Sequence, residues 1–214
     1  LMMVTAIPLE TDGLPVVLEL LKNATDSIMI GSGEYREGQF FKDMVSNFND
    51  AVIKDKLTQL YNRRFIDERL PVDIVDATVK NMPLSIIFFD VDGLKFINDN
   101  YGHSVGDMVL KEVGNTVKKS IRADKDWAAR YGGDEFIICL TNSTYDDAYN
   151  IAERIRKSIE EIIVSHQNIS IKFTISLGIY TTHGLKLTAE EIINLADENM
   201  YKAKRSGRNR TIGI

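Results

Sequence analysis

From residue 84 onward, some segments are apolar runs of strand length and others repeat apolar residues with the helical period, which predicts a domain that mixes strands and helices. Apolar runs of strand length predict strands over 84–90, 127–131, 136–140 and 169–180. Apolar residues three and four positions apart predict helices over 94–121, with a break near 101–103, and over 145–164. Thr188 and Glu191 form a capping box that starts a last helix.

The order of these elements predicts the fold class. A strand, a helix, a hairpin, a helix and a strand follow one another, which is the ferredoxin-like order. We therefore expect an α+β fold, with a ferredoxin-like or palm-type antiparallel sheet flanked by helices, preceded by an N-terminal β-hairpin and a linker helix. Asp55 is expected to cap a helix that continues from Leu57.

The hairpin and the linker helix are predicted from the first 54 residues. Strand-like runs over 4–10 and 14–20 flank an Asp-Gly pair at 12–13, which favours a tight turn. Because a hairpin is marginal in water by itself, it must pack on something else. Between Gly38 and Lys54 the apolar residues lie on one helical face, either of a surface helix or of one half of a dimeric coiled coil.

Composition narrows the class of protein and of partner. The chain has 214 residues, 44% hydrophobic and 27% charged, which is typical of a globular protein with one domain and a smaller appendage. No apolar run can span a bilayer, so we expect no membrane contact from this segment. The net charge of -5 disfavours a nucleic-acid polymer as partner but does not oppose a single nucleotide. Cys139, the one cysteine, lies in an apolar strand, which is typical of a reducing compartment.

Acidic residues stand at the ends of two predicted strands. Asp134 and Glu135 follow a Gly-Gly pair at 132–133, which predicts a tight hairpin between two strands. Asp90 and Asp92 stand at the end of the first apolar run. Two acidic strand ends side by side supply the oxygen ligands that Mg²⁺ prefers, usually completed by nucleotide phosphates. The alternative, that the carboxylates only solvate the strand ends, is kept for Asp92.

Five segments of the chain resemble the GGDEF family of diguanylate cyclases. Residues 130–136, Arg-Tyr-Gly-Gly-Asp-Glu-Phe, match the signature that names the family. The other four segments, in the family's order, are 55–64, 90–99, 101–107 and 203–209. The preceding hairpin resembles the last two strands of a PAS sensor domain. The domains implied are a PAS-like remnant over 1–30, a signalling helix over 31–54 and a GGDEF domain over 55–214.

The resemblance implies a bacterial diguanylate cyclase, which condenses two GTP into cyclic di-GMP and releases pyrophosphate. It also implies a homodimer of two half-sites, each with one GTP and two Mg²⁺ or Mn²⁺ ions, under the control of an upstream sensor domain. The metal ligands implied are Asp90, the backbone carbonyl of Val91, Asp134 and Glu135. Asp134 is the better candidate for the catalytic base, but the choice between it and Glu135 stays open. A cytoplasmic location is expected, with membrane attachment of a longer protein left open.

The same resemblance implies a second group of residues, which would bind the guanine base. Asn98 and Asp107 are expected to read guanine, because an amide donates to O6 and a carboxylate accepts from N1–H and the 2-amino group. His103 either lines this pocket or is a helix-capping or core residue.

Three cations are assigned to the phosphates. Lys95 is expected to neutralise charge on the transferred phosphate, which is a catalytic role. Lys204 and Arg208 are expected to hold the β- and γ-phosphates of GTP. The alternative for these two residues is that they only complement the C-terminal dipole of the last helix.

One segment departs from the family. Many members carry an Arg-x-x-Asp motif that binds the product, and here Asp126 has the aspartate position whereas the arginine position holds Ala123. Arg122 lies one residue early, so we expect weak or absent feedback inhibition at this site. Other functions left open are a GTP-binding module without activity, a cyclase with a single-nucleotide product, and an interaction scaffold.

Overall fold

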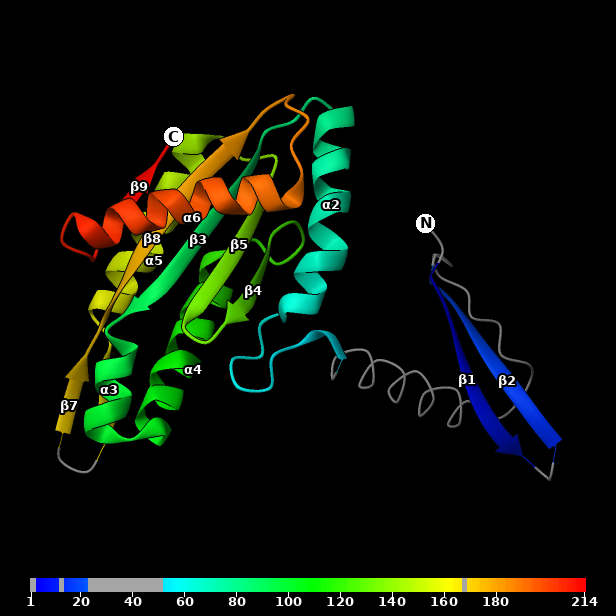
Figure 1. Cartoon of the computed structure of the whole chain (residues 1–214), viewed down its shortest axis with the longest axis horizontal. Helices are drawn as coiled ribbons and strands as arrows, with labels where there is room; N and C mark the ends of the chain where they lie inside the picture. Colours follow the sequence, from blue (N-terminus) through cyan, green and yellow to red (C-terminus); the bar gives the residue numbers. More distant parts are fainter. Residues whose placement is uncertain (1–2, 12–13, 23–51, 167–168) are drawn as a thin grey trace. The chain divides into compact units, whose positions relative to one another are not determined.

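The computed structural model describes residues 3–11, 14–22, 52–166 and 169–214, and the chain divides into two units, Leu1–Asn47 and Phe48–Ile214 (Figure 1). In the first unit, strands β1 (Met3–Thr11) and β2 (Leu14–Lys22) pair antiparallel, with Thr11 opposite Leu14. The predicted hairpin is therefore confirmed, and its membership of a PAS-like domain stays a prediction. Nearly all of the linker helix predicted over 38–54 lies outside the described residues.

The second unit alternates helices and strands along the chain. Its longer elements are α2 (Arg63–Val79), β3 (Leu84–Asp92), α3 (Leu94–Tyr101), α4 (His103–Ser120), β4 (Trp127–Gly132), β5 (Glu135–Thr141), α5 (Tyr145–Glu160), β8 (Thr174–Thr182) and α6 (Ala189–Arg205). The short strands are β6 (Ile163–His166), β7 (Ile169–Lys172) and β9 (Thr211–Gly213). The capping box at Thr188 and Glu191 is confirmed.

One five-stranded sheet organises this unit. The strand order is β4-β5-β3-β8-β9, and every neighbouring pair is antiparallel except β8 and β9. The strands of the predicted strand-helix-hairpin-helix-strand order are β3, β4, β5 and β8, and β3 lies between β5 and β8. The predicted α+β class, with an antiparallel sheet flanked by helices, is confirmed.

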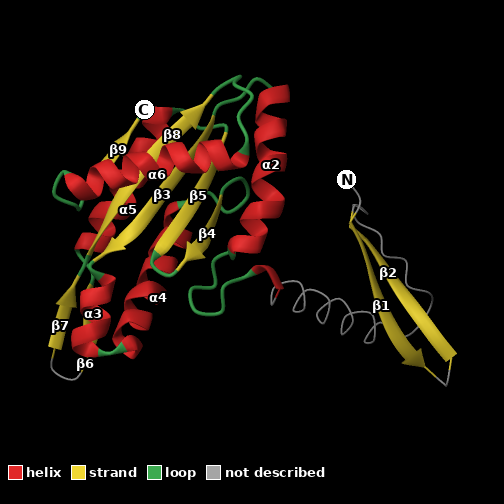
Figure 2. Cartoon of the chain, viewed as in Figure 1, coloured by secondary structure: helices red, strands yellow, loops and turns green. Residues whose placement is uncertain are grey.

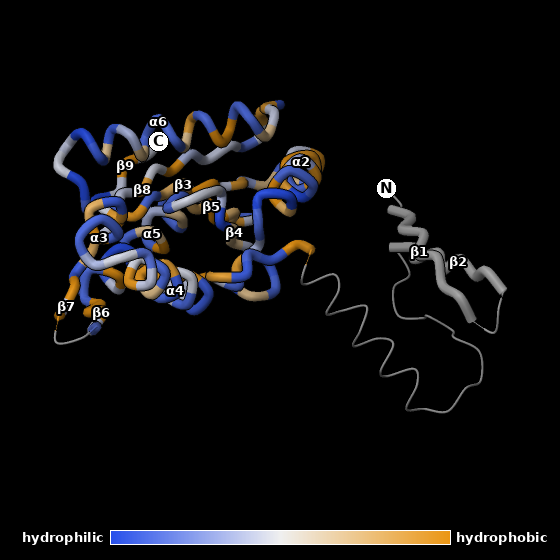
Figure 3. Tube along the Cα trace, turned by 60° about the horizontal axis from the view of Figure 1, so that its bottom comes forward, coloured by the Kyte–Doolittle hydropathy of each residue, from blue (hydrophilic) through white to orange (hydrophobic). Residues whose placement is uncertain are grey.

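Helices cover both faces of the sheet, as Figure 3 shows for α2 and α6 on one side and α4 on the other. Successive residues of β3 enter opposite cores because side chains alternate along a strand. Phe89 and Val91 pack in the core with α4 and α5, whereas Ile86 and Phe88 pack in the core with α2 and α6. This double burial explains why β3 reads as an unbroken apolar run.

The start of the domain differs from the prediction. The Asp55 carboxylate accepts hydrogen bonds from the backbone and hydroxyl of Thr58 at 2.8 Å each, which closes a turn and not a helix. The helix is α2, and its N-cap is Asn62, whose side chain accepts from the Phe65 amide at 3.2 Å. The sequence obscured α2 because Pro71 lies inside it and its exposed face carries Val72, Val75 and Val79, which blurs the amphipathic pattern.

Two element boundaries also differ. The helix predicted over 145–164 ends at Glu160, and residues 163–166 form β6. The strand predicted over 169–180 is divided into β7 and β8 at Phe173, which is buried. Ile162 continues the apolar spacing of α5, so hydrophobic period alone does not mark where that helix ends.

A polar contact anchors α2 to the sheet. The indole nitrogen of Trp127 on β4 donates to the Asp73 carboxylate on α2 at 2.7 Å. Arg69 also pairs with Asp73, and the Phe65 ring meets the Trp127 ring edge-on at 5.4 Å. Since the Asp73 side chain is only 5% exposed, these partners offset the desolvation of its charge. None of the helices in the described ranges has the length and hydropathy of a bilayer-spanning segment.

Candidate active site

The two acidic strand ends meet through the register of β3 and β5. Asp90 is opposite Glu135 in the antiparallel pairing, and the Val91 amide donates to the Asp134 carbonyl at 3.2 Å. The β4–β5 turn therefore lies beside the end of β3, directly before α3 (Figure 2). The predicted meeting of these acidic segments is confirmed.

An arginine fixes the shape of the acidic turn. Gly133 has a φ of 51°, a left-handed conformation that glycine adopts without strain. The Arg130 guanidinium donates to the Gly133 carbonyl at 2.9 and 2.6 Å and pairs with Asp55 at 3.3 Å. The turn that presents Asp134 is thus tied to the segment that opens the domain.

A cleft of about 170 Å³ lies between the end of β3, the turn and the end of α6. It is lined by Asp90, Val91, Asp92, Gly93, Leu94, Lys95, Asp134, Lys204 and Arg208. Six of the ten predicted site residues are therefore brought into one cleft. Glu135, Asn98, His103 and Asp107 are not among its lining residues.

The two cations of the cleft arrive from the C-terminal end of α6. Lys204 Nζ lies 2.8 Å from Asp90 Oδ2, and Arg208 Nε lies 4.0 Å from Asp92 Oδ1. Helix α6 packs closely against β8 at Gly178. A β-carbon at this position would overlap the Ala196 carbonyl of α6, so only glycine fits there. Lys204 thus pairs with an acid that is also a predicted metal ligand.

Burial and like charge act together on the acids of the site. Burial raises the pKa of Asp90 to about 6; the ion pair with Lys204 opposes this rise, and the charges of Asp134 and Asp92 add to it. Burial also raises the pKa of Glu135, and the charge of Asp134 adds to that rise. A divalent cation would relieve this repulsion, so its binding favours the ionised carboxylates.

The raised pKa of Asp90 predicts a pH dependence of stability in the metal-free protein. From about pH 4 to about pH 6 the folded state binds more protons at this site than the unfolded state, so the free energy of unfolding falls as pH rises. Asp90→Asn should lack this component, so its stability relative to wild type should increase between about pH 4 and about pH 7. Urea denaturation with a chelator measures it. The exposed Asp124→Asn serves as control, and a pH-independent difference for Asp90→Asn would contradict the assignment.

The donor set fits a divalent ion shared with a substrate. Asp90 and Asp134 bring carboxylates to the cleft, and Val91, whose backbone carbonyl is a predicted ligand, is also among the lining residues. Within the described ranges, no group of three or more His, Cys, Asp or Glu side chains could hold a metal ion by itself. The two carboxylates in one cleft suit Mg²⁺, which usually takes one or two protein carboxylates and completes its shell with phosphates and water.

The predicted guanine readers lie on α3 and α4. Asn98 Oδ1 is buried without a hydrogen-bond partner and faces Gly106, whereas His103 and Asp107 are exposed. A buried amide oxygen without a partner is uncommon unless a ligand or water satisfies it. This oxygen faces Gly106, and the roles of Asn98, His103 and Asp107 toward guanine stay predictions.

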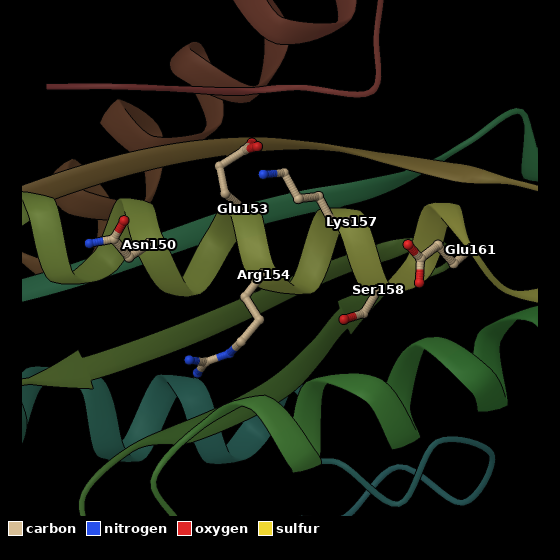
Figure 4. Close-up of a pocket in the computed structure, with 6 residues that line it drawn as sticks. All are labelled: Asn150, Glu153, Arg154, Lys157, Ser158 and Glu161. Atoms are coloured by element: carbon tan, nitrogen blue, oxygen red, sulfur yellow. The ribbon is translucent and has the colours of Figure 1, made fainter.

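A second hollow, of about 460 Å³, lies on the outer face of α5. Its lining residues belong to one helix and its end, and they mix both charges (Figure 4): Asn150, Glu153, Arg154, Lys157, Ser158 and Glu161. Although larger, it has no pair of facing acids and no polar group from a second element in its lining. The chemistry belongs to the smaller cleft.

Comparison with known proteins decides the family. Residues 52–210 match the family model described as Diguanylate cyclase, GGDEF domain. The chain belongs to the GGDEF family. Within it, the response regulator PleD of Caulobacter vibrioides (strain NA1000 / CB15N) is 36% identical over 180 residues, which are 83% of this chain and 39% of PleD.

A second relative and a solved structure of GGDEF proteins are also similar to this chain. Diguanylate cyclase A of Treponema denticola is 44% identical over 131 residues, 61% of this chain and 35% of that relative. The chain thus spans less than two fifths of these two relatives. A crystal structure of the coiled coil and GGDEF domain of DgcB from Caulobacter crescentus, in complex with c-di-GMP, has a TM-score of 0.77 at 24% identity, covering 84% of this chain and 94% of the crystallised chain. It shows the shared fold.

The GGDEF cleft contains a residue that sequence reasoning misjudged. Asp92 was kept as a solvating acid, yet its side chain is 6% exposed and accepts from the hydroxyls of Thr174 and Ser176 at 2.7 Å each. It also accepts from the backbone amide of Asn209 at 3.2 Å. Sequence offered no signal for this role, because the amide of Asn209 is 117 positions away.

Proposed function

We propose that this GGDEF domain condenses two GTP into cyclic di-GMP, with a divalent metal requirement. The observation that carries the proposal is the cleft that is lined by Asp90 and Asp134 together with Lys204 and Arg208, in a chain whose residues 52–210 match the cyclase family. A triphosphate with its metal fits this alternation of acids and cations, since phosphoryl transfer depends on positioning and charge neutralisation.

The acids are assigned to metal and proton handling. Asp90, the Val91 carbonyl, Asp134 and Glu135 are proposed to hold two Mg²⁺ or Mn²⁺ ions. When bound, such ions polarise the attacking 3′-hydroxyl and the leaving pyrophosphate oxygen. Asp134 or Glu135 receives the 3′-hydroxyl proton as the oxygen attacks the α-phosphorus of the second GTP and pyrophosphate departs. The raised pKa of Glu135 supports its capacity to accept a proton.

The cations and the amide are assigned to the nucleotide. Lys95 neutralises charge on the transferred phosphate, and Lys204 and Arg208 hold the β- and γ-phosphates. Asn98, Asp107 and His103 bind the guanine base. Lys204 must exchange Asp90 for phosphate when GTP binds, which releases Asp90 for the metal.

Two copies of the chain are needed for this reaction, since one cleft holds one triphosphate and the product joins two nucleotides. We propose a symmetric homodimer with the clefts face to face. An N-terminal sensor would control it, and a cytoplasmic location suits GTP as substrate. Mass spectrometry of the product formed from GTP and Mg²⁺ tests the reaction. A single-nucleotide cyclic product, or specific activity that stays flat down to monomeric concentrations, would contradict it.

Gly106→Ala is expected to weaken GTP binding about tenfold without loss of stability. A β-carbon there would overlap Asn98 Oδ1 and force that flexible side chain out of its place. Alanine also favours a helix over glycine by up to about 1 kcal/mol, so α4 should not weaken. The measurements are the KM for GTP and the thermal midpoint. Lys111→Ala, on an exposed position of α4, is the control, and an unchanged KM for Gly106→Ala would argue against Asn98 as a base contact.

Feedback inhibition by cyclic di-GMP is predicted to be weak or absent at the segment around Asp126, which departs from the Arg-x-x-Asp motif. Both Asp126 oxygens are engaged by Arg122 at 2.7 and 2.8 Å, and the Asp126 side chain is 0% exposed. Arg122→Ala should therefore destabilise the fold by about 3 kcal/mol, because it leaves a buried carboxylate without its cation. Turnover should be insensitive to micromolar cyclic di-GMP in wild type. Inhibition that Arg122→Ala abolishes would overturn this prediction.

A further inference from the structure

The loop that follows α6 holds its backbone in a conformation that side chains disfavour. Gly207, Arg208 and Asn209 have φ angles of 114°, 62° and 47°, so two consecutive residues other than glycine are left-handed. Asparagine tolerates this region better than most residues, whereas arginine has no such preference. Such a conformation persists only where surrounding contacts hold it.

Asn209 supplies three such contacts, through its backbone amide and through both polar atoms of its side chain. Its backbone amide donates to Asp92 Oδ2 at 3.2 Å, at the end of β3. Its side-chain amide donates to Glu160 Oε1 at 2.7 Å and accepts from Arg156 Nη1 at 2.8 Å, both near the end of α5. One residue therefore links the loop to two separate elements.

The partners of Asn209 are themselves braced. Arg156 is 13% exposed and forms a two-pronged pair with Glu153 at 2.9 and 3.0 Å. Glu153 in turn accepts from the hydroxyl of Thr211 at 2.8 Å, on β9. We refer to Glu153, Arg156, Glu160 and Asn209 as the α5 bracket. Its charged side chains are paired with one another, which holds the Asn209 side chain in one orientation.

The α5 bracket includes Asn209, which directly follows a residue of the cleft in the chain. Arg208 lines the cleft, its side chain is 62% exposed, and its guanidinium is 4.0 Å from Asp92, the outer limit of an ion pair. Its direction is therefore set by the backbone of the loop more than by its own contacts. The backbone of Arg208 donates to the Ala203 carbonyl at 3.1 Å and accepts from Arg210 Nε at 3.0 Å. The neighbouring Asn209 is the residue that ties the loop to β3 and α5.

We propose that Asn209 is a positioning residue that aims Arg208 at the terminal phosphates of the nucleotide, with Arg156 as its support. This inference rests on the proposed function, since it takes the phosphates of GTP as the group that Arg208 meets. It predicts that the α5 bracket contributes to recognition of the β- and γ-phosphates and not to recognition of the nucleoside.

Two variants separate this role from a general structural one. Asn209→Gly keeps the left-handed backbone accessible and removes both side-chain hydrogen bonds. Arg156→Gln removes the support from α5. Arg154→Gln is the matched control: Arg154 leaves α5 in the direction opposite to Glu153 (Figure 4) and donates to the Ser120 carbonyl of α4 at 2.6 Å.

The measurement is the dissociation constant of 3′-deoxy-GTP and of 3′-deoxy-GMP, with Mg²⁺, by titration calorimetry. These ligands lack the attacking hydroxyl, so no condensation occurs, and they differ only in the two phosphates at issue. Asn209→Gly and Arg156→Gln are expected to weaken triphosphate binding about tenfold and to leave monophosphate binding within about twofold of wild type. Arg154→Gln should leave both constants unchanged. Monophosphate binding also verifies that each variant is folded.

Each other outcome overturns a distinct statement. Equal weakening of both ligands, or of neither, would overturn the positioning role of Asn209. A wild type that binds 3′-deoxy-GTP but forms no cyclic di-GMP from GTP would overturn the proposed reaction, while the ratio of the two constants still tests the α5 bracket. A wild type that binds neither ligand would overturn both.

Discussion

Asp134→Asn is expected to reduce cyclic di-GMP formation by about 1000-fold or more, because it removes a proposed metal ligand and a candidate base in one change. The fold should be retained. The contact of Asp134 with β3 is made by its backbone carbonyl, which accepts from the Val91 amide at 3.2 Å and is preserved in asparagine. Product is measured by mass spectrometry after incubation with GTP and Mg²⁺.

Asp124→Asn provides the matched control for this experiment, since it makes the same chemical change at an exposed acid outside the cleft. It should retain wild-type turnover. If Asp134→Asn kept more than about a tenth of the wild-type rate, the residue would be neither an essential ligand nor the base. Glu135→Gln would then be the next variant to test as base.

Lys204→Ala is expected to have opposite effects on two ligands. The KM for GTP should rise about tenfold or more, because a cation is lost from the proposed phosphate site. Binding of Mn²⁺ without nucleotide should become tighter, because the ammonium that lies 2.8 Å from Asp90 no longer competes for that carboxylate. The measurement is made at about pH 8, well above the wild-type pKa of about 6 for Asp90, because loss of Lys204 removes a contact that lowers this pKa.

Kinetics give the first constant, and calorimetry with Mn²⁺ gives the second. Lys202→Ala is the control on the same helix, because Lys202 pairs with Asn199 at 2.9 Å and does not line the cleft. Loss of affinity for both GTP and Mn²⁺ in Lys204→Ala would indicate that the lysine only maintains the fold of the site.

The sequence predicted the acidic part of the cleft well for a physical reason. Asp90 and Asp134 each stand at the end of an apolar run, and two buried strands of one sheet have few ways to pair. Their meeting therefore follows from local signals. Lys204 was assigned to phosphate by resemblance, whereas its ion pair with Asp90 depends on how α6 crosses the sheet, which no local pattern specifies.

The features that sequence reasoning missed depend on distant contacts. Asp92 looked like a solvated acid because its partners Thr174, Ser176 and Asn209 are 82 or more positions away. The start of α2 was misplaced because its cap is Asn62, whose side chain accepts from the Phe65 amide, and not Asp55, which lies seven residues earlier. Both errors arose where side-chain hydrogen bonds, which period and composition do not reveal, determine the structure.

The contact between Trp127 and Asp73 gives the molecule a built-in optical probe. Trp127 is the only tryptophan of the chain, is 6% exposed and lies at the junction of α2 with the sheet. Its fluorescence therefore reports the GGDEF unit, while the N-terminal hairpin, which has no tryptophan, is silent. Far-ultraviolet circular dichroism registers both units. Heating the protein under both detectors would show whether the hairpin melts together with the GGDEF unit or before it.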